Sequence, residues 1–184
     1  MSTTFGPSAL VTPANALTMA RFALTPVLLV LILAAAPSMP LLVLWIALAG
    51  TDGVDGYLAR RHGTTRSGAF LDPLADKFLV LGAMVCLVSE GLLWWLPVAL
   101  IGAREVAVSV YRSRVGRQGV SVPARPLAKA KTVVQAVVVG FALAPIEALW
   151  YRRLTGGLLL VALALTLVSG AQYLTEARRR HVAV

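Results

Sequence analysis

The chain has 184 residues, of which 58% are hydrophobic and 14% are charged, and its mean hydropathy is +0.80. This composition is far more apolar than that of a soluble domain, so it predicts an integral membrane protein. The formal net charge of +9 would favour a nucleic-acid partner in a soluble protein. In a membrane protein it instead reflects cytoplasmic loops and anionic headgroups, so we expect a lipid bilayer and no nucleic acid.

Six apolar segments follow one another along the chain, each of about the ~20 residues that a helix needs to cross a bilayer. They are predicted at residues 17–36, 41–60, 72–89, 92–112, 129–149 and 155–175. Turn-forming sequences such as Pro37-Ser-Met-Pro40 separate them. We therefore expect an all-α integral membrane fold with six transmembrane helices, forming a single domain over residues 1–184.

The basic residues are distributed unevenly among the predicted connections. Most Lys and Arg residues lie after the second segment, after the fourth segment and near the C-terminus, whereas the opposite side holds only Arg152 and Arg153. Because Lys and Arg resist translocation, the basic side is expected to face the cytoplasm. We therefore expect a multi-pass protein of the cell membrane with both termini in the cytoplasm.

The four aspartates of the chain lie at the end of the second predicted segment and the start of the third. On a helix, residues three or four positions apart share a face, so Asp52 pairs with Asp55 and Asp72 with Asp76. The two segments are antiparallel and connected by a short loop, so both pairs can meet at one level. If Arg60 lies at the interface, Asp52 is about 12 Å deep, within reach of the cytoplasm.

Four carboxylates at such a depth would repel one another and take up protons unless a cation compensated them. A donor set made only of oxygen selects hard cations such as Mg²⁺ or Mn²⁺. Two such ions can hold a diphosphate and stabilise charge during an in-line displacement. We therefore predict a two-metal site at Asp52, Asp55, Asp72 and Asp76, opening to the cytoplasm.

Simpler explanations stay open for these residues. The aspartates could form ion pairs with Arg60, Arg61 or Lys77, or line a path for cation transport. Gly56 and Ala59 share the face of the first aspartate pair, where small residues let a substrate approach the backbone. The same two residues would also suit tight packing between helices.

The complete pattern resembles the signature of a known family. Asp52-x-x-Asp55-Gly56-x-x-Ala59-Arg60, followed by Gly68-x-x-x-Asp72-x-x-x-Asp76, is similar to the motif of the CDP-alcohol phosphotransferases, membrane enzymes in which an alcohol displaces CMP from a CDP-linked substrate. The spacer between Arg60 and Gly68 is shorter than is usual in the family, which affects loop conformation more than chemistry. The resemblance implies a homodimer in which Asp52, Asp55 and Asp72 are metal ligands and Asp76 is both a ligand and the catalytic base.

The N-terminal region extends the resemblance. Asn15, Thr18 and Arg21 look like the family's Asn-x-x-Thr-x-x-Arg opening. Together with Gly56, Ala59, Arg60 and Gly68, they are implied to line the site of the CDP-lipid. Asn15 and Thr18 could alternatively cap the start of a helix.

Basic residues in the second half of the chain indicate the alcohol. Arg104 lies within an apolar segment, where it needs a carboxylate or a phosphate as partner; pairing with Glu105 is not expected, because adjacent helix residues face apart. Arg104, Arg112, Lys129 and Lys131 resemble the acceptor-phosphate pocket of the family's glycerol-phosphate branch. That branch implies CDP-diacylglycerol and glycerol 3-phosphate as substrates, although Lys129 and Lys131 could simply be cytoplasmic anchors.

Three competing functions follow from the same residues. The first is a sister enzyme with another acceptor, inositol phosphate or phosphatidylglycerol. The second is a metal-ion transporter, for which intramembrane aspartates are equally natural. The third is a polyprenyl transferase with aspartate-rich diphosphate motifs, against which the Gly-x-x-Ala-Arg element argues.

Overall fold

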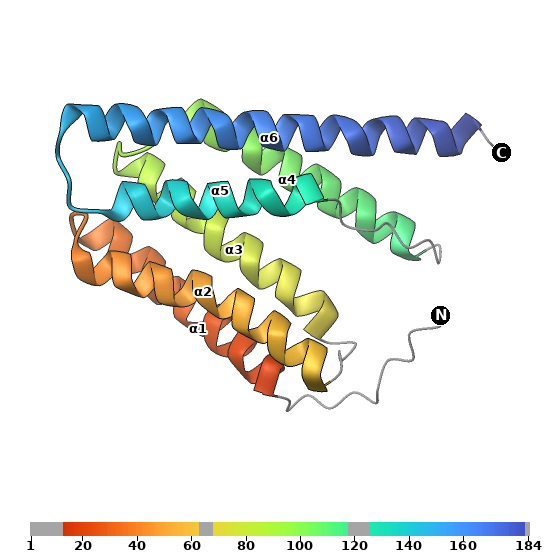
Figure 1. Cartoon of the computed structure of the whole chain (residues 1–184), viewed down its shortest axis with the longest axis horizontal. Helices are drawn as coiled ribbons and strands as arrows, with labels where there is room; N and C mark the ends of the chain where they lie inside the picture. Colours follow the sequence, from red (N-terminus) through yellow and green to blue (C-terminus); the bar gives the residue numbers. More distant parts are fainter. Residues whose placement is uncertain (1–12, 63–67, 118–125, 183–184) are drawn as a thin grey trace. The chain divides into compact units, whose positions relative to one another are not determined.

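The computed structural model describes the backbone of residues 13–62, 68–117 and 126–182, with side chains at 17–51, 74–111, 113–115 and 130–172. These residues form six α-helices in the predicted order, and the described residues contain no strand (Figure 1). The helices are α1 (Pro13–Ala34), α2 (Met39–His62), α3 (Gly68–Ser89), α4 (Trp95–Arg117), α5 (Pro126–Leu143) and α6 (Leu149–Val182). The all-α prediction is confirmed.

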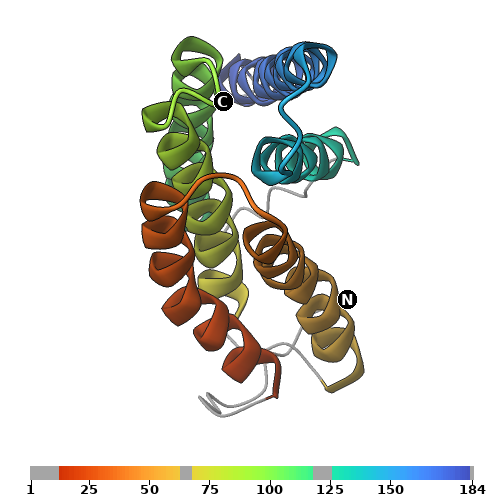
Figure 2. The same cartoon turned by 90° about the vertical axis from the view of Figure 1, so that its left-hand side faces the viewer.

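The chain divides into two compact units, the first formed by α1, α2 and α3 with residues Leu143–Pro145. In this unit α1 packs against both α2 and α3, and the close approach of α1 to α3 is visible in Figure 2. Gly82 of α3 makes this approach tight, because a Cβ at that position would lie 2.9 Å from Leu29 Cδ1 of α1. The first unit therefore holds the two helices that carry the aspartates.

The second unit contains α4, α6 and most of α5. Helices α4 and α6 pack directly against each other, with Val98, Ile101, Leu159 and Ala162 among their buried residues. The Phe141 ring near the end of α5 stacks on the Tyr151 ring at the start of α6, with centroids 5.3 Å apart. Polar side chains, described below, also connect α5 to its neighbours.

Helix ends differ from the predicted segments where turn residues act. Gly91 adopts a φ of 69°, the left-handed conformation that commonly follows a helix C-terminus, and it lies just after the end of α3 at Ser89. After this turn, α4 begins at Trp95 rather than at residue 92. Helix α5 ends at Leu143, six residues before the predicted end, because Pro145 disfavours helical geometry at the residue before it. Helix α6 begins at Leu149 rather than residue 155 and therefore includes Arg152 and Arg153.

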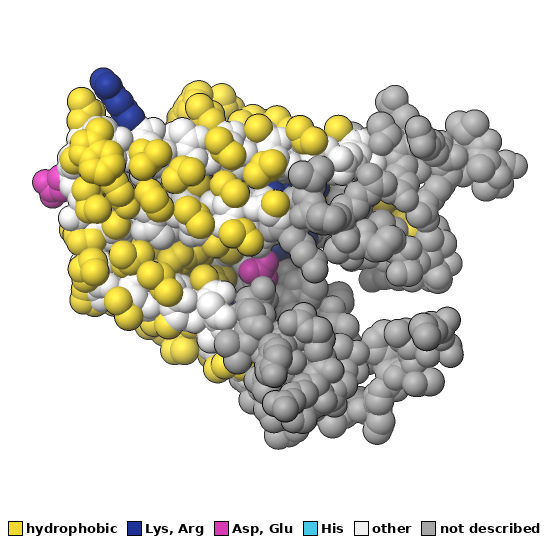
Figure 3. All heavy atoms as spheres, viewed as in Figure 1, with side chains coloured by type: hydrophobic (Ala, Val, Ile, Leu, Met, Phe, Trp, Pro, Cys, Tyr) yellow, Lys and Arg dark blue, Asp and Glu magenta, His cyan; other side chains and the backbone are white. Residues whose placement is uncertain are grey.

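Large hydrophobic side chains are exposed on many helices, and they cover most of the described part of the face in Figure 3. Met19, Val30, Ile46, Val106 and Leu167 are among those more than a third exposed. Within the described residues, Leu17–Ala34 and Leu149–Gln172 are long and apolar enough to cross a membrane. Apolar surface of this extent is suited to lipid, so the structure indicates a membrane protein.

Candidate functional site

Arg21 connects the N-terminal motif to the helix of the first aspartate pair. It is 1% exposed, and its Nε donates a hydrogen bond of 3.0 Å to Thr51 Oγ1 of α2. Thr51 Oγ1 in turn donates to the carbonyl of Leu48 at 2.6 Å. Thr51 immediately precedes Asp52, so the arginine of the predicted CDP-lipid site is tied to the aspartate motif. Sequence reasoning missed Thr51, although it is a polar residue directly before the motif.

Thr18 lies one turn before Arg21 on α1 and is also buried, at 2% exposure. A capping residue lies at the start of its helix. Helix α1, however, begins five residues before Thr18, at Pro13. Helix capping therefore does not account for Thr18. The backbone of Asn15 lies within α1, and its side chain is outside the described residues.

The aspartates lie on helices, as the spacing predicted. Asp52 and Asp55 belong to α2, Asp72 and Asp76 belong to α3, and α2 contacts α3. Asp76 is partly exposed, and the side chains of the other three lie outside the described residues. Within the residues whose side chains are described, no three His, Cys, Asp or Glu side chains form a metal cluster, so the metal site stays a prediction.

Six other predicted site residues, Lys129 among them, also lie where side chains are not described. Gly56, Ala59 and Arg60 lie in α2 and Gly68 is the first residue of α3, while Arg112 lies in α4. Lys129 lies in the first turn of α5, and its side chain is likewise not described. The prediction that these residues bind substrate is not tested by the structure.

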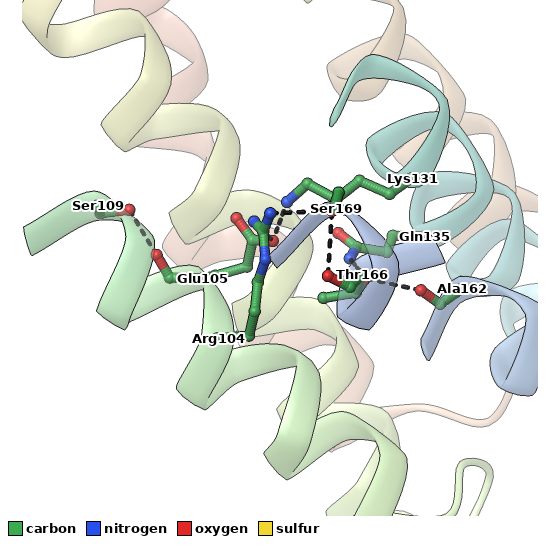
Figure 4. Close-up of polar contacts among 8 residues, drawn as sticks. All are labelled: Arg104, Glu105, Ser109, Lys131, Gln135, Ala162, Thr166 and Ser169. Carbon is green, nitrogen blue, oxygen red and sulfur yellow. Dashed lines mark hydrogen bonds and ion pairs between the residues drawn. The ribbon is translucent and has the colours of Figure 1, made fainter. Parts of the chain in front are cut away.

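The second unit contains a buried ionic cluster, formed by Arg104, Glu105 and Lys131 (Figure 4). Arg104 Nη1 donates to Glu105 Oε1 at 3.0 Å, and Lys131 Nζ forms an ion pair with the same oxygen. The three side chains are 9%, 6% and 5% exposed, respectively. Two residues predicted to bind the acceptor phosphate, one on α4 and one on α5, therefore meet at one carboxylate.

The expectation that Arg104 does not pair with Glu105 was wrong. Adjacent Cβ atoms on a helix do diverge, but the arginine side chain is long enough for its guanidinium to reach the neighbouring carboxylate. Burial favours this contact, because isolated charges in apolar surroundings are costly. Lys131 is buried as a whole residue as well, with 4% of its surface exposed. A lysine that anchors the protein at the headgroups would be exposed, so this alternative does not fit.

Helix α6 extends the cluster with neutral hydrogen-bonding groups that sequence reasoning did not single out. Arg104 Nη2 donates to Ser169 Oγ at 2.9 Å, and Ser169 Oγ donates to the Thr166 carbonyl at 3.0 Å. Gln135 Nε2 of α5 donates to Thr166 Oγ1 at 3.0 Å. Ser169 and Thr166 are three positions apart in an apolar helix, a one-face spacing that could have indicated them.

Gly170 makes room for Arg104 on the surface of α6. A Cβ at Gly170 would lie 3.2 Å from Arg104 Nε and 3.3 Å from its Cγ. Both separations are tighter than ordinary van der Waals contact. The glycine therefore helps to determine the path of the arginine toward Glu105 and Ser169.

The cluster brings two basic side chains from different helices to one carboxylate. Arginine and lysine are the side chains that commonly bind phosphate in proteins, and arginine in particular suits its oxygen acceptors. The prediction that these residues bind the acceptor phosphate is not tested by the structure.

Comparison with known proteins places the chain among lipid-synthesising enzymes. A family model described as CDP-alcohol phosphatidyltransferase matches residues 11–168. The chain is similar to a CDP-diacylglycerol--glycerol-3-phosphate 3-phosphatidyltransferase from Salmonella choleraesuis (strain SC-B67), with 41% identity over 170 residues. That match covers 88% of this chain and 92% of the relative.

A second relative is a probable phosphatidylglycerophosphate synthase from Mycobacterium tuberculosis (strain ATCC 25618 / H37Rv). It is 38% identical over 173 residues, which cover 90% of this chain and 81% of that protein. The matched residues of the family model include all four aspartates, Arg104 and Lys131. The match therefore spans both units rather than one.

Proposed function

The chain belongs to the CDP-alcohol phosphatidyltransferase family, and we propose that it transfers the phosphatidyl group of CDP-diacylglycerol to glycerol 3-phosphate. The products are phosphatidylglycerophosphate and CMP, so the enzyme acts in phospholipid biosynthesis. The relatives named above support this acceptor. The observation that carries the proposal is the buried cluster in which Arg104 of α4 and Lys131 of α5 meet at Glu105, because paired basic side chains of this kind suit the phosphate of glycerol 3-phosphate.

In the proposed reaction, the primary hydroxyl of glycerol 3-phosphate attacks the β-phosphorus of CDP-diacylglycerol. A new phosphorus–oxygen bond forms, and the bond from the β-phosphorus to the oxygen shared with CMP breaks. CMP leaves with the electron pair of that bond, and Asp76 accepts the proton of the hydroxyl. Asp76 suits this role because it is partly exposed on α3, where a substrate could reach it.

The four aspartates fit a pair of Mg²⁺ or Mn²⁺ ions as cofactors, because carboxylates on two contacting helices make an all-oxygen donor set. Asp52, Asp55 and Asp72 would act chiefly as ligands, and Asp76 as a ligand that also serves as base. Bound there, the ions would neutralise charge on the diphosphate. Asp76 would serve as base at an oxygen that is not used to hold the ions.

The CDP-lipid is proposed to bind along α1 and α2, between the N-terminal motif and the aspartates. Asn15, Thr18, Arg21, Gly56, Ala59, Arg60 and Gly68 form this proposed subsite. The hydrogen bond from Arg21 to Thr51 supports it, because it ties the N-terminal motif to the residue before Asp52. Arg21 would thereby be oriented before substrate arrives, which lowers the entropic cost of binding.

The acceptor phosphate is proposed to bind at Arg104, Arg112, Lys129 and Lys131. In this proposal Glu105 keeps Arg104 and Lys131 together, and the phosphate binds beside these two basic side chains. Ser169 supports Arg104 from α6. The acceptor enters from the cytoplasm, where it is dissolved.

The proposed setting is the cell membrane, with six membrane-spanning helices, both termini in the cytoplasm and one catalytic domain. The distribution of Lys and Arg supports this orientation. The family match across both units supports a single domain over residues 1–184. A homodimer is proposed from family membership.

A purified-protein assay tests the acceptor. The protein in detergent is mixed with CDP-diacylglycerol, Mg²⁺ and radiolabelled glycerol 3-phosphate, inositol phosphate or phosphatidylglycerol, and CMP release is measured. We expect CMP and a labelled lipid with glycerol 3-phosphate only. Turnover with another acceptor, but not with glycerol 3-phosphate, would establish the sister enzyme instead.

Reconstituted vesicles test the other classes. The same protein is measured for uptake of Mn²⁺ and for turnover of isoprenyl diphosphates. We expect neither activity at a rate comparable to CMP release. Metal uptake without any CMP release would identify a transporter.

A further inference from the structure

Two shallow hollows lie next to each other along the first turns of α6, and neither is lined by a residue assigned to catalysis. One, of about 590 Å³, is lined by Trp94, Arg152, Arg153 and Gly156, among others. The other, of about 850 Å³, includes Trp150 and Val161 in its lining. Arg153 and Gly157 line both hollows, so the two form one continuous surface.

The two arginines lie in the first turns of an apolar helix. Both are exposed, yet they lie at the start of Leu149–Gln172, a stretch apolar enough to cross a membrane. Neither forms an ion pair with another residue whose side chain is described. Figure 3 shows a basic side chain projecting at the end of the molecule where α6 begins. An anion supplied from outside the chain would compensate these charges.

Gly156 and Gly157 of α6 keep the surface hollow, because they have no side chain to fill it. A glycine in a helix interior costs about 1 kcal/mol relative to alanine, so a consecutive pair is unfavourable. A Cβ at Gly156 or Gly157 would meet nothing within 4 Å, whereas one at Gly170 or Gly82 would press on a neighbour. Within the described structure, no packed side chain explains the pair.

Aromatic residues mark the level of this surface in a bilayer. Trp94 and Trp150 line the hollows and are 55% and 64% exposed. Exposed tryptophans at the ends of apolar helices lie at the headgroup level of a bilayer. Leu160 and Val161 continue the surface one to two turns further along the apolar helix, so a headgroup at the arginines would have its acyl chains beside apolar residues.

We infer that this surface binds an anionic phospholipid. The lipid phosphate contacts the guanidinium groups of Arg152 and Arg153, and the acyl chains run over Gly156 and Gly157 toward Leu160. Arginine binds phosphate through paired hydrogen bonds, and basic sites between membrane helices select anionic headgroups. In the proposed topology the bound lipid belongs to the outer leaflet.

A second copy of the chain is a less favourable occupant of the same surface. Small residues do allow membrane helices to approach each other. A symmetric contact through Gly156 and Gly157, however, would bring the arginines of both copies toward each other. Like charges placed against each other across an interface are strongly unfavourable.

Quenching of tryptophan fluorescence by brominated lipid tests the inference at the surface itself. The full chain is reconstituted in phosphatidylcholine vesicles containing a minor fraction of phosphatidylglycerol, with bromine on the acyl chains of one lipid or the other. The Trp95→Phe background removes an exposed tryptophan that lines neither hollow. We expect stronger quenching by phosphatidylglycerol than by an equal fraction of phosphatidylcholine, with a preference of roughly fivefold per arginine.

Three variants separate the charge of the surface from its shape. Arg152→Ala combined with Arg153→Ala is expected to abolish the preference for phosphatidylglycerol. Gly157→Leu, which meets open space, is expected to lower quenching by filling the hollow while keeping both charges. Arg114→Ala, an exposed arginine elsewhere on α4, is expected to leave the preference unchanged.

Several results would overturn the inference. Equal quenching by the two lipids would show that the surface does not select anionic lipid, as would a preference that persists in the double arginine variant. Loss of the preference in millimolar inorganic phosphate would show a free-anion site instead. Protection of Trp94 and Trp150 from both lipids, together with crosslinking of two chains through Gly157→Cys, would show that a second copy occupies the surface.

Discussion

Glu105 supplies the carboxylate of the buried ionic cluster in the second unit. Its carboxylate contacts Arg104 of its own helix and Lys131 of α5. Removing one partner of a buried ionic cluster leaves an uncompensated charge, which typically costs about 3–5 kcal/mol. The cluster therefore connects the stability of the fold to the proposed acceptor site.

Glu105→Gln is expected to lower the free energy of unfolding by about 3–5 kcal/mol, because two buried cations would lose the carboxylate that they share. Chemical denaturation in detergent measures the change. Glu90→Gln is the matched control, since Glu90 is exposed. Adding Lys131→Met to Glu105→Gln should restore part of the loss, and an unaltered stability in the single variant would contradict the described contacts.

Lys131→Ala is expected to raise the KM for glycerol 3-phosphate by about 10- to 100-fold, the value of a lost charge-assisted hydrogen bond. The KM for CDP-diacylglycerol should change much less, because Lys131 is proposed to touch only the acceptor. Steady-state measurement of CMP release gives both constants, with the exposed Arg114→Ala as control. Equal changes in the two constants would show a structural role for Lys131 alone.

Asp76→Asn is expected to lower kcat by roughly 10²- to 10⁴-fold, because an amide cannot accept the hydroxyl proton. The substitution keeps the size of the side chain, so the protein should still elute as a folded particle in detergent. CMP release measures the effect, and Glu90→Gln again serves as a control for loss of a carboxylate on the same part of the chain. Near-normal activity would remove Asp76 from the proposed mechanism.

Helices α4, α5 and α6 are connected by hydrogen bonds between polar side chains in addition to apolar packing. Ser169 and Thr166 of α6 receive hydrogen bonds from Arg104 of α4 and Gln135 of α5. Hydrogen bonds between membrane helices contribute about 0.6 to 2 kcal/mol each. This arrangement sets the positions of the helices at the level of the basic cluster.

Gly170→Ala tests whether the close approach of α6 to Arg104 matters for the acceptor. The new methyl group would lie 3.2 Å from Arg104 Nε, so the guanidinium has to shift by a few tenths of an ångström. We expect a several-fold rise in the KM for glycerol 3-phosphate with little change in stability, measured by CMP release and denaturation. Gly102→Ala, which meets nothing within 4 Å, should leave KM unchanged, and identical behaviour of the two variants would contradict this role.

The termini of the helices show which local signals the sequence reveals. Gly91 follows α3, whose end at Ser89 agrees with the predicted end of the third segment. Pro145 follows α5, whose end at Leu143 lies six residues before the predicted end of the fifth segment. The start of α6 was harder to predict. Arg152 and Arg153 suggested a connection between helices, whereas the surrounding apolar residues allow the helix to include them.

The orientation of the protein in the membrane can be tested by labelling single cysteines. In a Cys86→Ser background, Glu147→Cys lies exposed in the connection between α5 and α6, and Ser113→Cys lies exposed near the end of α4. In intact cells, an impermeant maleimide is expected to label the first position and not the second. Permeabilised cells should label both, and the reverse pattern in intact cells would contradict the proposed orientation.

The helical class, the membrane character and the family could all be predicted from the amino-acid sequence alone. Apolar composition and segment length require helices in lipid, because backbone polar groups there must be satisfied internally. The aspartate spacing is local to two helices, so the motif and the metal chemistry that it predicts could be read without coordinates. Family membership then followed from a pattern that is contained within residues 52–76.

The tertiary structure decided which charged and polar side chains meet. Arg21 lies 30 positions from Thr51, Lys131 lies 26 positions from Glu105, and Arg104 lies 65 positions from Ser169. Such contacts depend on the packing of helices that are distant in sequence, and helical periodicity carries no information about them. Helix geometry alone argues against the Arg104–Glu105 pair, because adjacent side chains diverge. The pair forms because both side chains are buried, where an isolated charge is costly.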